Sequence, residues 1–134
     1  MITKKVLDPN RIRRIDGGFS FIPHRFMTDG FVETLSQKEL LLYFFLILVS
    51  DRHGLSFYSY DAICSSLKLS LDDYLEARDG LIKKELIAFD GTLFQVLDLP
   101  PTPYQDSSGA SLRPYRHQRR NFIQQSLSET EGGR

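Results

Sequence analysis

The fold is decided by residues 70–97, whose sequence is SLDDYLEARDGLIKKELIAFDGTLFQVL. Its first half carries the start signal of a helix, because Ser70 and Asp73 form the capping-box pattern, in which two side chains each bond a free backbone N–H. The apolar side chains that follow recur at helical spacing to about Glu85, namely Leu71, Tyr74, Leu75, Leu81 and Ile82. Two extended runs, 86–89 and 92–97, then flank Asp90-Gly91, a dipeptide typical of a type I′ turn with positive φ at both positions. We therefore predict a helix followed by a β-hairpin.

Two further helices are predicted upstream of this stretch. A second capping box, Ser36-Gln37-Lys38-Glu39, opens a helix over about 37–51. That helix is apolar nearly all round, so we expect it to be a fully buried core helix, ended by Gly54 as a left-handed C-cap. A short strand over 55–58 follows, Ser59 caps a second helix over 60–67, and residues 68–70 form a tight turn. Residues 19–23 are expected to form a short strand or an extended arm.

This order of elements is typical of a winged helix-turn-helix, in which two helices joined by a short turn precede a β-hairpin. We expect a mainly α fold with a small β-hairpin wing, in the α+β class. The domain is expected over 17–99, between a basic N-terminal arm over 1–16 and a Pro-rich linker with a basic tail over 100–134. The second boundary is marked by Pro100-Pro101-Thr102-Pro103, which cannot continue a helix or a central strand.

Four motifs make the resemblance more specific: LSQKELLLY at 35–43, DRHGLSF at 51–57, LKLS at 67–70 and GLIKKELI at 80–87. Over about residues 19–97 the chain resembles the winged-helix domains of plasmid replication initiators and primosomal DnaD-type proteins. In those domains Leu-Ser-x-x-Glu opens the first helix, x-Leu-Gly-x-Ser leads into the recognition helix, and Leu-x-x-x-Gly-Leu-Ile enters the wing. The resemblance implies a bacterial DNA-binding accessory in replication, transcription or a mobile element.

Composition limits the alternatives. A length of 134 residues suits one domain with extensions, and 17 Lys and Arg balance 17 Asp and Glu, so no global charge indicates a nucleic-acid partner. Cys64 is the one cysteine, which excludes an internal disulfide and a thiolate metal cluster. The N-terminus lacks the apolar stretch of a signal peptide, and the apolar run over 39–49 is shorter than the ~20 residues of a membrane span. We expect a cytoplasmic protein without membrane association.

The third helix departs from the family pattern, which is rich in Arg, Thr and Ser where this helix meets DNA. Its carboxylates are Asp72, Asp73, Glu76 and Asp79, and its cations are Arg78, Lys83 and Lys84. Carboxylates repel the phosphates that supply most non-specific DNA affinity, so insertion of this helix into a major groove is disfavoured. The carboxylates either bind a protein partner or are structural, with the first two favouring the helix N-terminus and Asp79 pairing with Lys83.

Positive charge gathers instead on the two extensions. The tail carries Arg113, Tyr115, Arg116, Arg119 and Arg120 within eight residues, and the N-terminal arm carries Arg13 and Arg14. Such arms can lie along phosphates or enter a minor groove, with the tyrosine stacking on a base. The tail can equally be a solvated segment or fold back on the acidic helix, and 121–127 has the spacing of a short amphipathic docking helix.

No catalytic pattern is present in the sequence. The histidines at 24, 53 and 117 are scattered, Cys64 has the setting of a structural thiol, and no Gly-rich phosphate loop occurs. We expect neither enzymatic activity nor a cofactor, metal or small-molecule substrate. Gly80 is unusual inside a helix and is expected to mark close packing against the first helix.

The aromatic residues around the first helix suggest a further partner. Most of this cluster is expected in the core: Tyr43, Phe44, Phe45, Phe57, Tyr58 and Tyr60. The first helix nevertheless has more apolar surface than its small neighbours can cover, which favours a homodimer formed through this helix or through the arm that carries Phe19 and Phe21. The sequence thus predicts a DNA-associated winged-helix protein whose affinity comes from the wing and the basic arms. The alternative is an interaction module that binds a protein through its acidic third helix.

Overall fold

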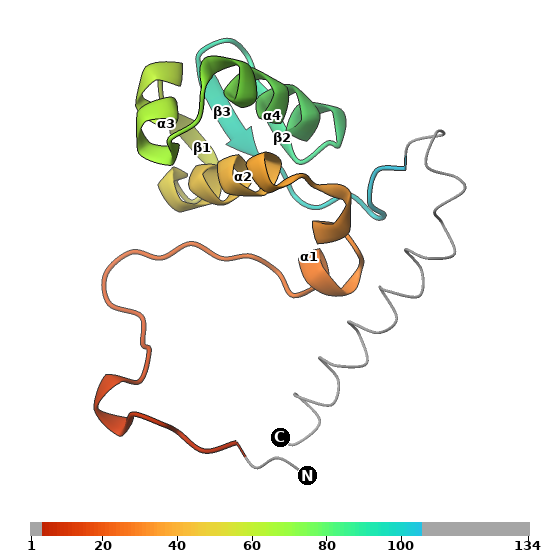
Figure 1. Ribbon diagram of the computed structural model, residues 1–134. Coiled ribbons are helices and arrows are strands. Elements are labelled where there is room, and N and C mark those ends of the chain that lie inside the picture. The colour runs from red at the N-terminus through yellow and green to blue at the C-terminus, as the bar shows by residue number, and fades with distance from the viewer. Residues whose placement is uncertain (1–3, 106–134) are drawn as a thin grey trace.

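The computed structural model describes residues 4–105 of the chain, and these form an α+β fold (Figure 1). Four α-helices and a three-stranded antiparallel sheet make up the described part. The elements are η1 (Pro9–Arg11), α1 (Arg25–Thr28), η2 (Val32–Thr34), α2 (Gln37–Val49), β1 (Leu55–Phe57), α3 (Tyr60–Leu67), α4 (Leu71–Lys83), β2 (Ile87–Phe89) and β3 (Leu93–Val96). The predicted combination of helices with a small β-hairpin is confirmed.

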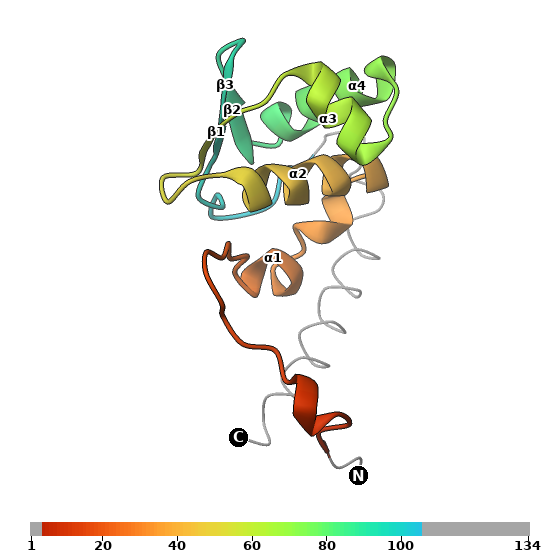
Figure 2. The same cartoon turned by 90° about the vertical axis from the view of Figure 1, so that its left-hand side faces the viewer.

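The sheet has the order β1-β3-β2, so the hairpin is extended by a strand that precedes α3. β3 pairs with β2 through Phe89↔Phe94 and with β1 through Ser56↔Phe94. The strand predicted over 55–58 is confirmed in position, but nothing in its residues indicates that it pairs with the second strand of the hairpin. Figure 2 shows the sheet beside the helices, with α2 below α3 and α4.

The tip of the hairpin differs from the predicted type I′ turn, because only Gly91 has positive φ, at 105°. Asp90 instead organises the turn through its carboxylate, which accepts hydrogen bonds from the backbone N–H of Leu93 at 2.7 Å and of Thr92 at 2.9 Å. These two bonds hold the pKa of Asp90 below its usual value, since they favour the charged form. A side-chain bond to the backbone has thus replaced the second left-handed residue.

Serine caps begin the three longer helices. The predicted capping box of α2 is confirmed, with Ser36 Oγ accepting from Glu39 N at 3.1 Å and Glu39 Oε1 accepting from Ser36 N at 2.8 Å. Ser59 and Ser70 cap α3 and α4 through their hydroxyls. The second predicted box is only half formed, because the Asp73 carboxylate accepts a hydrogen bond from Lys38 of α2.

Gly54 does not end α2, which stops at Val49 with an extended C-cap residue. The glycine has φ of +82° within the turn that leads into β1. There its carbonyl accepts a hydrogen bond from Val96 N at 2.8 Å, and an added Cβ would lie 2.5 Å from Val96 O. Glycine is required here for the close approach of this turn to β3.

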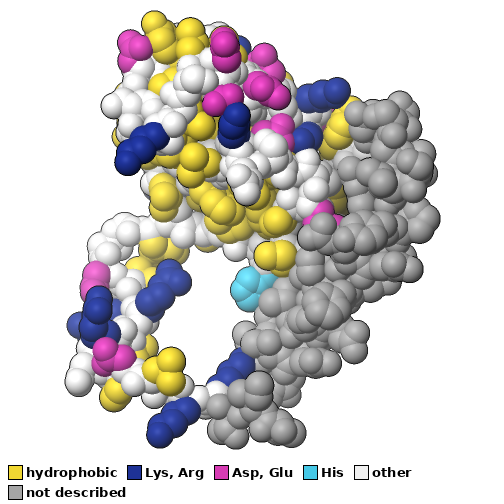
Figure 3. Space-filling model, in the orientation of Figure 1, with side chains coloured by type: hydrophobic (Ala, Val, Ile, Leu, Met, Phe, Trp, Pro, Cys, Tyr) yellow, Lys and Arg dark blue, Asp and Glu magenta, His cyan; other side chains and the backbone are white. Residues whose placement is uncertain are grey.

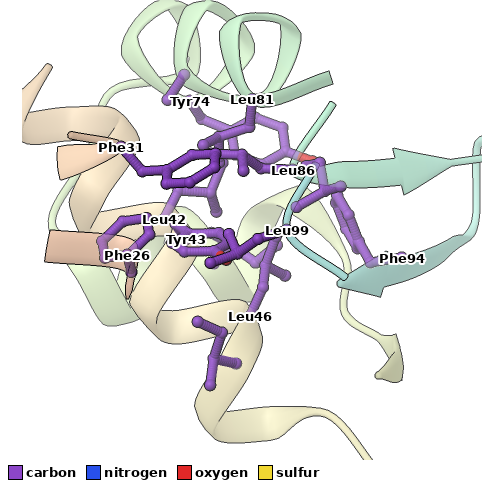
Figure 4. Packing of buried hydrophobic residues seen from close by; sticks show 14 residues of the cluster. Phe26, Phe31, Leu42, Tyr43, Leu46, Tyr74, Leu81, Leu86, Phe94 and Leu99 are labelled. Atoms are coloured by element: carbon purple, nitrogen blue, oxygen red, sulfur yellow. The ribbon is translucent and has the colours of Figure 1, made fainter. Parts of the chain in front are cut away.

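The core lies between α2, α4 and the sheet, and α1 covers one end of it (Figure 4). Its largest fully buried side chains come from α2, α3, α4, the sheet and the segments that join them: Phe31, Leu42, Leu46, Ile63, Tyr74, Leu81, Leu86, Ile87 and Phe94. Phe26 of α1 packs on Tyr43 of α2 with ring centroids 5.2 Å apart. Arg25 ties α1 to the end of the domain, donating to the carbonyls of Leu99 at 2.8 Å and Pro100 at 2.7 Å.

α2 is central, but the expectation that it is fully buried is wrong. One side of it remains in solvent, with exposed fractions of 42% for Leu41, 39% for Phe44 and 72% for Leu48. Of the six aromatic residues expected mostly in the core, only Tyr43 is buried. Phe57, on the edge strand β1, is exposed, as are Tyr58 and Tyr60 after it. Phe44 stays exposed because α1, with only four residues, covers little of α2.

Residues 12–24 form no strand in the structure, so of the two expectations for 19–23 the extended arm is the one observed. The segment leaves the body beside α1 and carries exposed Phe19 and Phe21 (Figures 1 and 2). Gly17, with φ of +70°, lies where the polar arm meets this segment. In the described part of the chain, no helix combines the length and apolar character that crossing a membrane requires.

Ser56 gives a first testable result, because its hydroxyl is buried in β1 without a hydrogen-bond partner. We expect Ser56→Ala to raise the free energy of unfolding by about 1 kcal/mol, since it removes an unsatisfied polar group from the interior. Urea unfolding followed by circular dichroism measures the change. Ser20→Ala, on the extended segment, is the control and should shift the value by less than about 0.5 kcal/mol. A loss of stability in Ser56→Ala would contradict this reading.

Candidate nucleic-acid interface

The basic side chains at α4 interact with other residues of the domain. Arg78 lies over the rings of Phe89, at 5.1 Å, and Tyr74, at 5.7 Å, and its guanidinium pairs with Asp79 at 3.1 Å. These contacts keep most of the side chain against the junction of α4 and β2. Arg78 therefore presents less charge to a partner than an arginine that is free in solvent.

Lys84, one of the residues predicted to contact DNA, is directed inward by its position at the end of α4. Its ammonium donates to Glu39 Oε1 and to the carbonyl of Thr34, both at 2.6 Å. The side chains of this ion pair are only 18% and 10% exposed, in the order Lys84, Glu39. Because both the charge and the donors are used inside the domain, Lys84 is a structural residue. Lys83, its neighbour, is exposed and lies over the ring of Tyr104 at 5.5 Å.

The four carboxylates of α4 are divided between internal pairs and open surface. Asp73 pairs with Lys38 of α2 at 2.7 Å, and this bond is the main reason that the pKa of Asp73 lies below its usual value. Asp79 pairs with Arg78, next to it in the chain, instead of with Lys83 as expected. Asp72 and Glu76 are exposed beside them. The outward face of α4 is therefore acidic, and acidic side chains are prominent over it in Figure 3.

The β2–β3 hairpin, predicted to be a wing, also lacks positive charge. No Lys or Arg occurs from 85 to 105, and the tip of the hairpin carries Asp90. A phosphate contact needs a cation or a free donor, so the predicted contribution of this hairpin to DNA affinity has no cation to carry it. Across residues 17–99, seven Lys and Arg stand against twelve Asp and Glu, which gives the domain a formal net charge of −5.

The N-terminal arm has the opposite charge. Residues 1–16 contain five Lys and Arg against two Asp, a formal net charge of +3. Arg11, Arg13 and Arg14 are exposed, and the pair between Arg14 and Asp16, 3.7 Å apart with both side chains 83% exposed, constrains its arginine little. Asp8 caps the 3-10 turn η1, whose last residue is Arg11, and accepts a hydrogen bond from Asn10 N at 3.0 Å. The arm thus carries exposed cations outside the body of the domain (Figure 3), two of them, Arg13 and Arg14, on the segment without helix or strand that follows η1.

The other predicted nucleic-acid contacts lie outside the described residues. They are Arg113, Tyr115, Arg116, Arg119 and Arg120, together with the expected docking helix over 121–127. The charged residues of α4 are evident in the sequence, but which of them are paired within the domain is not. The sequence contained an indication of the Lys84–Glu39 pair. The capping box places Glu39 at the start of a helix that is expected to be buried, where a carboxylate needs a counter-ion.

Among residues 4–105, the structure groups no three His, Cys, Asp or Glu side chains that could hold a metal ion.

A hollow of about 400 Å³ lies between the extended segment at Phe19 and Phe21 and the end of α2. Tyr43 lines it, and burial raises the pKa of this tyrosine to about 12, so its hydroxyl stays protonated. Comparison with protein-family models, curated proteins and solved structures finds no match to this chain.

Proposed function

We propose that this chain is a winged-helix, DNA-associated protein whose phosphate contacts come from its arginine-bearing arm and not from α4 or the wing. The observation that carries the proposal is the separation of charge, in which exposed arginines lie on the N-terminal arm, outside an acidic domain. The arrangement α2-β1-α3-α4-β2-β3, with β3 between β1 and β2, supports the winged-helix assignment. A role as an accessory in replication, transcription or a mobile element fits this fold.

The arm suits phosphate binding for a physical reason. Arginines on extended backbone can follow a phosphate chain, and each contact releases counterions from the DNA. The domain, with its formal net charge of −5, is repelled by the same phosphates. The arm must therefore bind the duplex with the domain, and α4 in particular, turned away from it. We expect weak sequence preference, because contacts to phosphate position a protein without reading bases.

The test is a fluorescence-anisotropy titration of duplex and single-stranded DNA at low and moderate salt. Replacing Arg11, Arg13 and Arg14 together by alanine should weaken binding about tenfold or more and lower the slope of log K against log salt by about 3. Lys68→Asn is the matched control: it removes one exposed cation from the domain, and asparagine tolerates the left-handed backbone of this position, where φ is 57°. It should change affinity less than twofold.

A further variant tests the placing of α4. Asp72→Asn combined with Glu76→Gln removes two exposed carboxylates from its outward face. If α4 is held away from DNA, the affinity stays within about twofold of the wild type, whereas a gain of tenfold or more would show that α4 faces the phosphates.

A second candidate function is favoured by that acidic face. An interaction module could bind a basic protein segment through Asp72, Glu76 and Asp79, with Arg78 and Lys84 held in internal pairs. Absence of DNA binding by the full chain even at low salt would contradict the first proposal. In that case a lysine-rich peptide should bind the wild type and should be lost by the Asp72→Asn, Glu76→Gln variant.

A further inference from the structure

The side of α2 that faces away from α4 is an apolar stripe made by Leu41, Phe44 and Leu48, here named the α2 stripe. All three side chains are exposed, and no charged residue occurs from 40 to 49. Their spacing, i, i+3 and i+7, is the a, d, a spacing with which one helix packs along another. In Figure 3, apolar side chains cover the lower surface of the domain, the side of α2 that faces away from α4.

Neighbouring elements enlarge the stripe. On one side Phe44 meets Phe26 of α1 edge to face, at 6.2 Å, and Met27 of the same helix is exposed. On the other side Phe45 packs on the half-exposed Tyr58 at 5.3 Å. At ~200 Å² for a large side chain, the exposed parts of this surface amount to on the order of 500 Å², at the upper end of what a monomer leaves uncovered.

We infer that the α2 stripe is covered by a second copy of this chain, with the two α2 helices antiparallel and Phe44 close to the two-fold axis. The stripe is self-complementary, because in that arrangement Leu41 of one copy faces Leu48 of the other. A charged partner would find no counter-charge on it, since residues 40–49 carry no charged side chain. The area is smaller than the ~800 Å² per partner of a standard interface, so the dimer has micromolar affinity, with exposed Phe19 and Phe21 of the arm available to extend the contact.

The test is the mass of the full chain in solution by sedimentation equilibrium. At about 100 µM we expect twice the monomer mass of 15.5 kDa, falling toward the monomer on dilution. Leu48→Glu should give a monomer at the same concentration with an unchanged far-ultraviolet spectrum. Leu71→Glu, an exposed leucine at the start of α4, is the matched control and should leave the dimer intact.

Cross-linking locates the axis independently. In a Cys64→Ser background, Phe44→Cys should form an intermolecular disulfide on mild oxidation, whereas Leu71→Cys should not. A wild-type mass that stays monomeric up to ~100 µM, or a dimer that Leu48→Glu leaves intact, would overturn the inference. The outcome is separate from the DNA proposal, because a monomer that binds DNA fails only this test and a dimer that does not bind DNA fails only the other.

Discussion

Replacing Lys84 with methionine is expected to lower the free energy of unfolding by about 3 kcal/mol, the largest loss we expect from a single charged residue. Lys84 donates to both Glu39 and the carbonyl of Thr34, and Glu39 Oε1 accepts in addition from Ser36 N. The ammonium thus joins the end of α4 to the start of α2 and to the turn before it. Methionine has similar length but leaves the carboxylate charged and nearly buried without its counter-ion. Thermal unfolding should show a drop of about 15 °C.

Lys83→Met is the matched control, since Lys83 is exposed and contacts only the Tyr104 ring among the interactions described for it. Its effect should stay below about 0.5 kcal/mol. A second variant tests the cause: Glu39→Gln in the Lys84→Met background removes the unpaired charge but keeps the capping pattern, because glutamine can bond Ser36 N. It should recover at least half of the lost stability. No difference between the Lys84 and Lys83 variants would contradict the structural role.

The sequence predicted the local parts of this fold well because their causes are local. Ser36 with Glu39 and Ser59 each satisfy backbone groups within three residues, and the helix starts at 37 and 60 follow directly. The end of α2 was placed two residues too late, since Gly54 was interpreted as a helix cap. Its positive φ was a correct inference, but the reason for it is contact with Val96, forty-two residues along the chain.

The parts that could not be predicted depend on which elements meet. Leu41, Phe44 and Leu48 are as apolar as the residues on the buried side of α2, so composition alone could not show which side α4 and the sheet would cover. The exposed spacing of i, i+3 and i+7 was present in the sequence, but the same run also fits a helix that is buried all round. The pairing of β1 with β3 is likewise non-local and had no signal in either strand.

The sequence predicted which residues of the candidate interface are charged, but not which of those charged side chains are exposed to a partner. Lys83 and Lys84 are adjacent and identical in type, yet one is exposed and the other is the partner of a buried carboxylate. That difference follows from their places at the end of α4, where successive residues point in directions about 100° apart. Whether a cation is free to bind a partner therefore depends on how the domain packs. Because Arg78 and Lys84 are paired within the domain, the exposed face of α4 is more acidic than its sequence suggested.

Replacing Gly80 with alanine should destabilise the protein by about 2 kcal/mol, although alanine is the better helix former by about 1 kcal/mol. A Cβ at this position would lie 2.9 Å from Glu39 Cδ and would overlap Glu39 Oε2. The predicted close packing of this glycine against the helix at 37–49, α2, is confirmed by those contacts. Glu39 cannot move aside freely, because its other oxygen is bonded to both Ser36 N and Lys84. Urea unfolding of the purified variant measures the loss.

The sign of the same substitution should reverse when Glu39 is alanine. The three atoms nearest to the added Cβ all belong to Glu39, so its truncation removes the obstacle and leaves only the gain in helix propensity. In the Glu39→Ala background, which is itself less stable, Gly80→Ala should therefore raise the free energy of unfolding by about 1 kcal/mol, a coupling of about 3 kcal/mol between the two sites. Additive effects in this double-mutant cycle would mean that Gly80 serves the backbone of α4 alone. A reversal of sign would mean that the glycine is kept for the carboxylate that Lys84 binds.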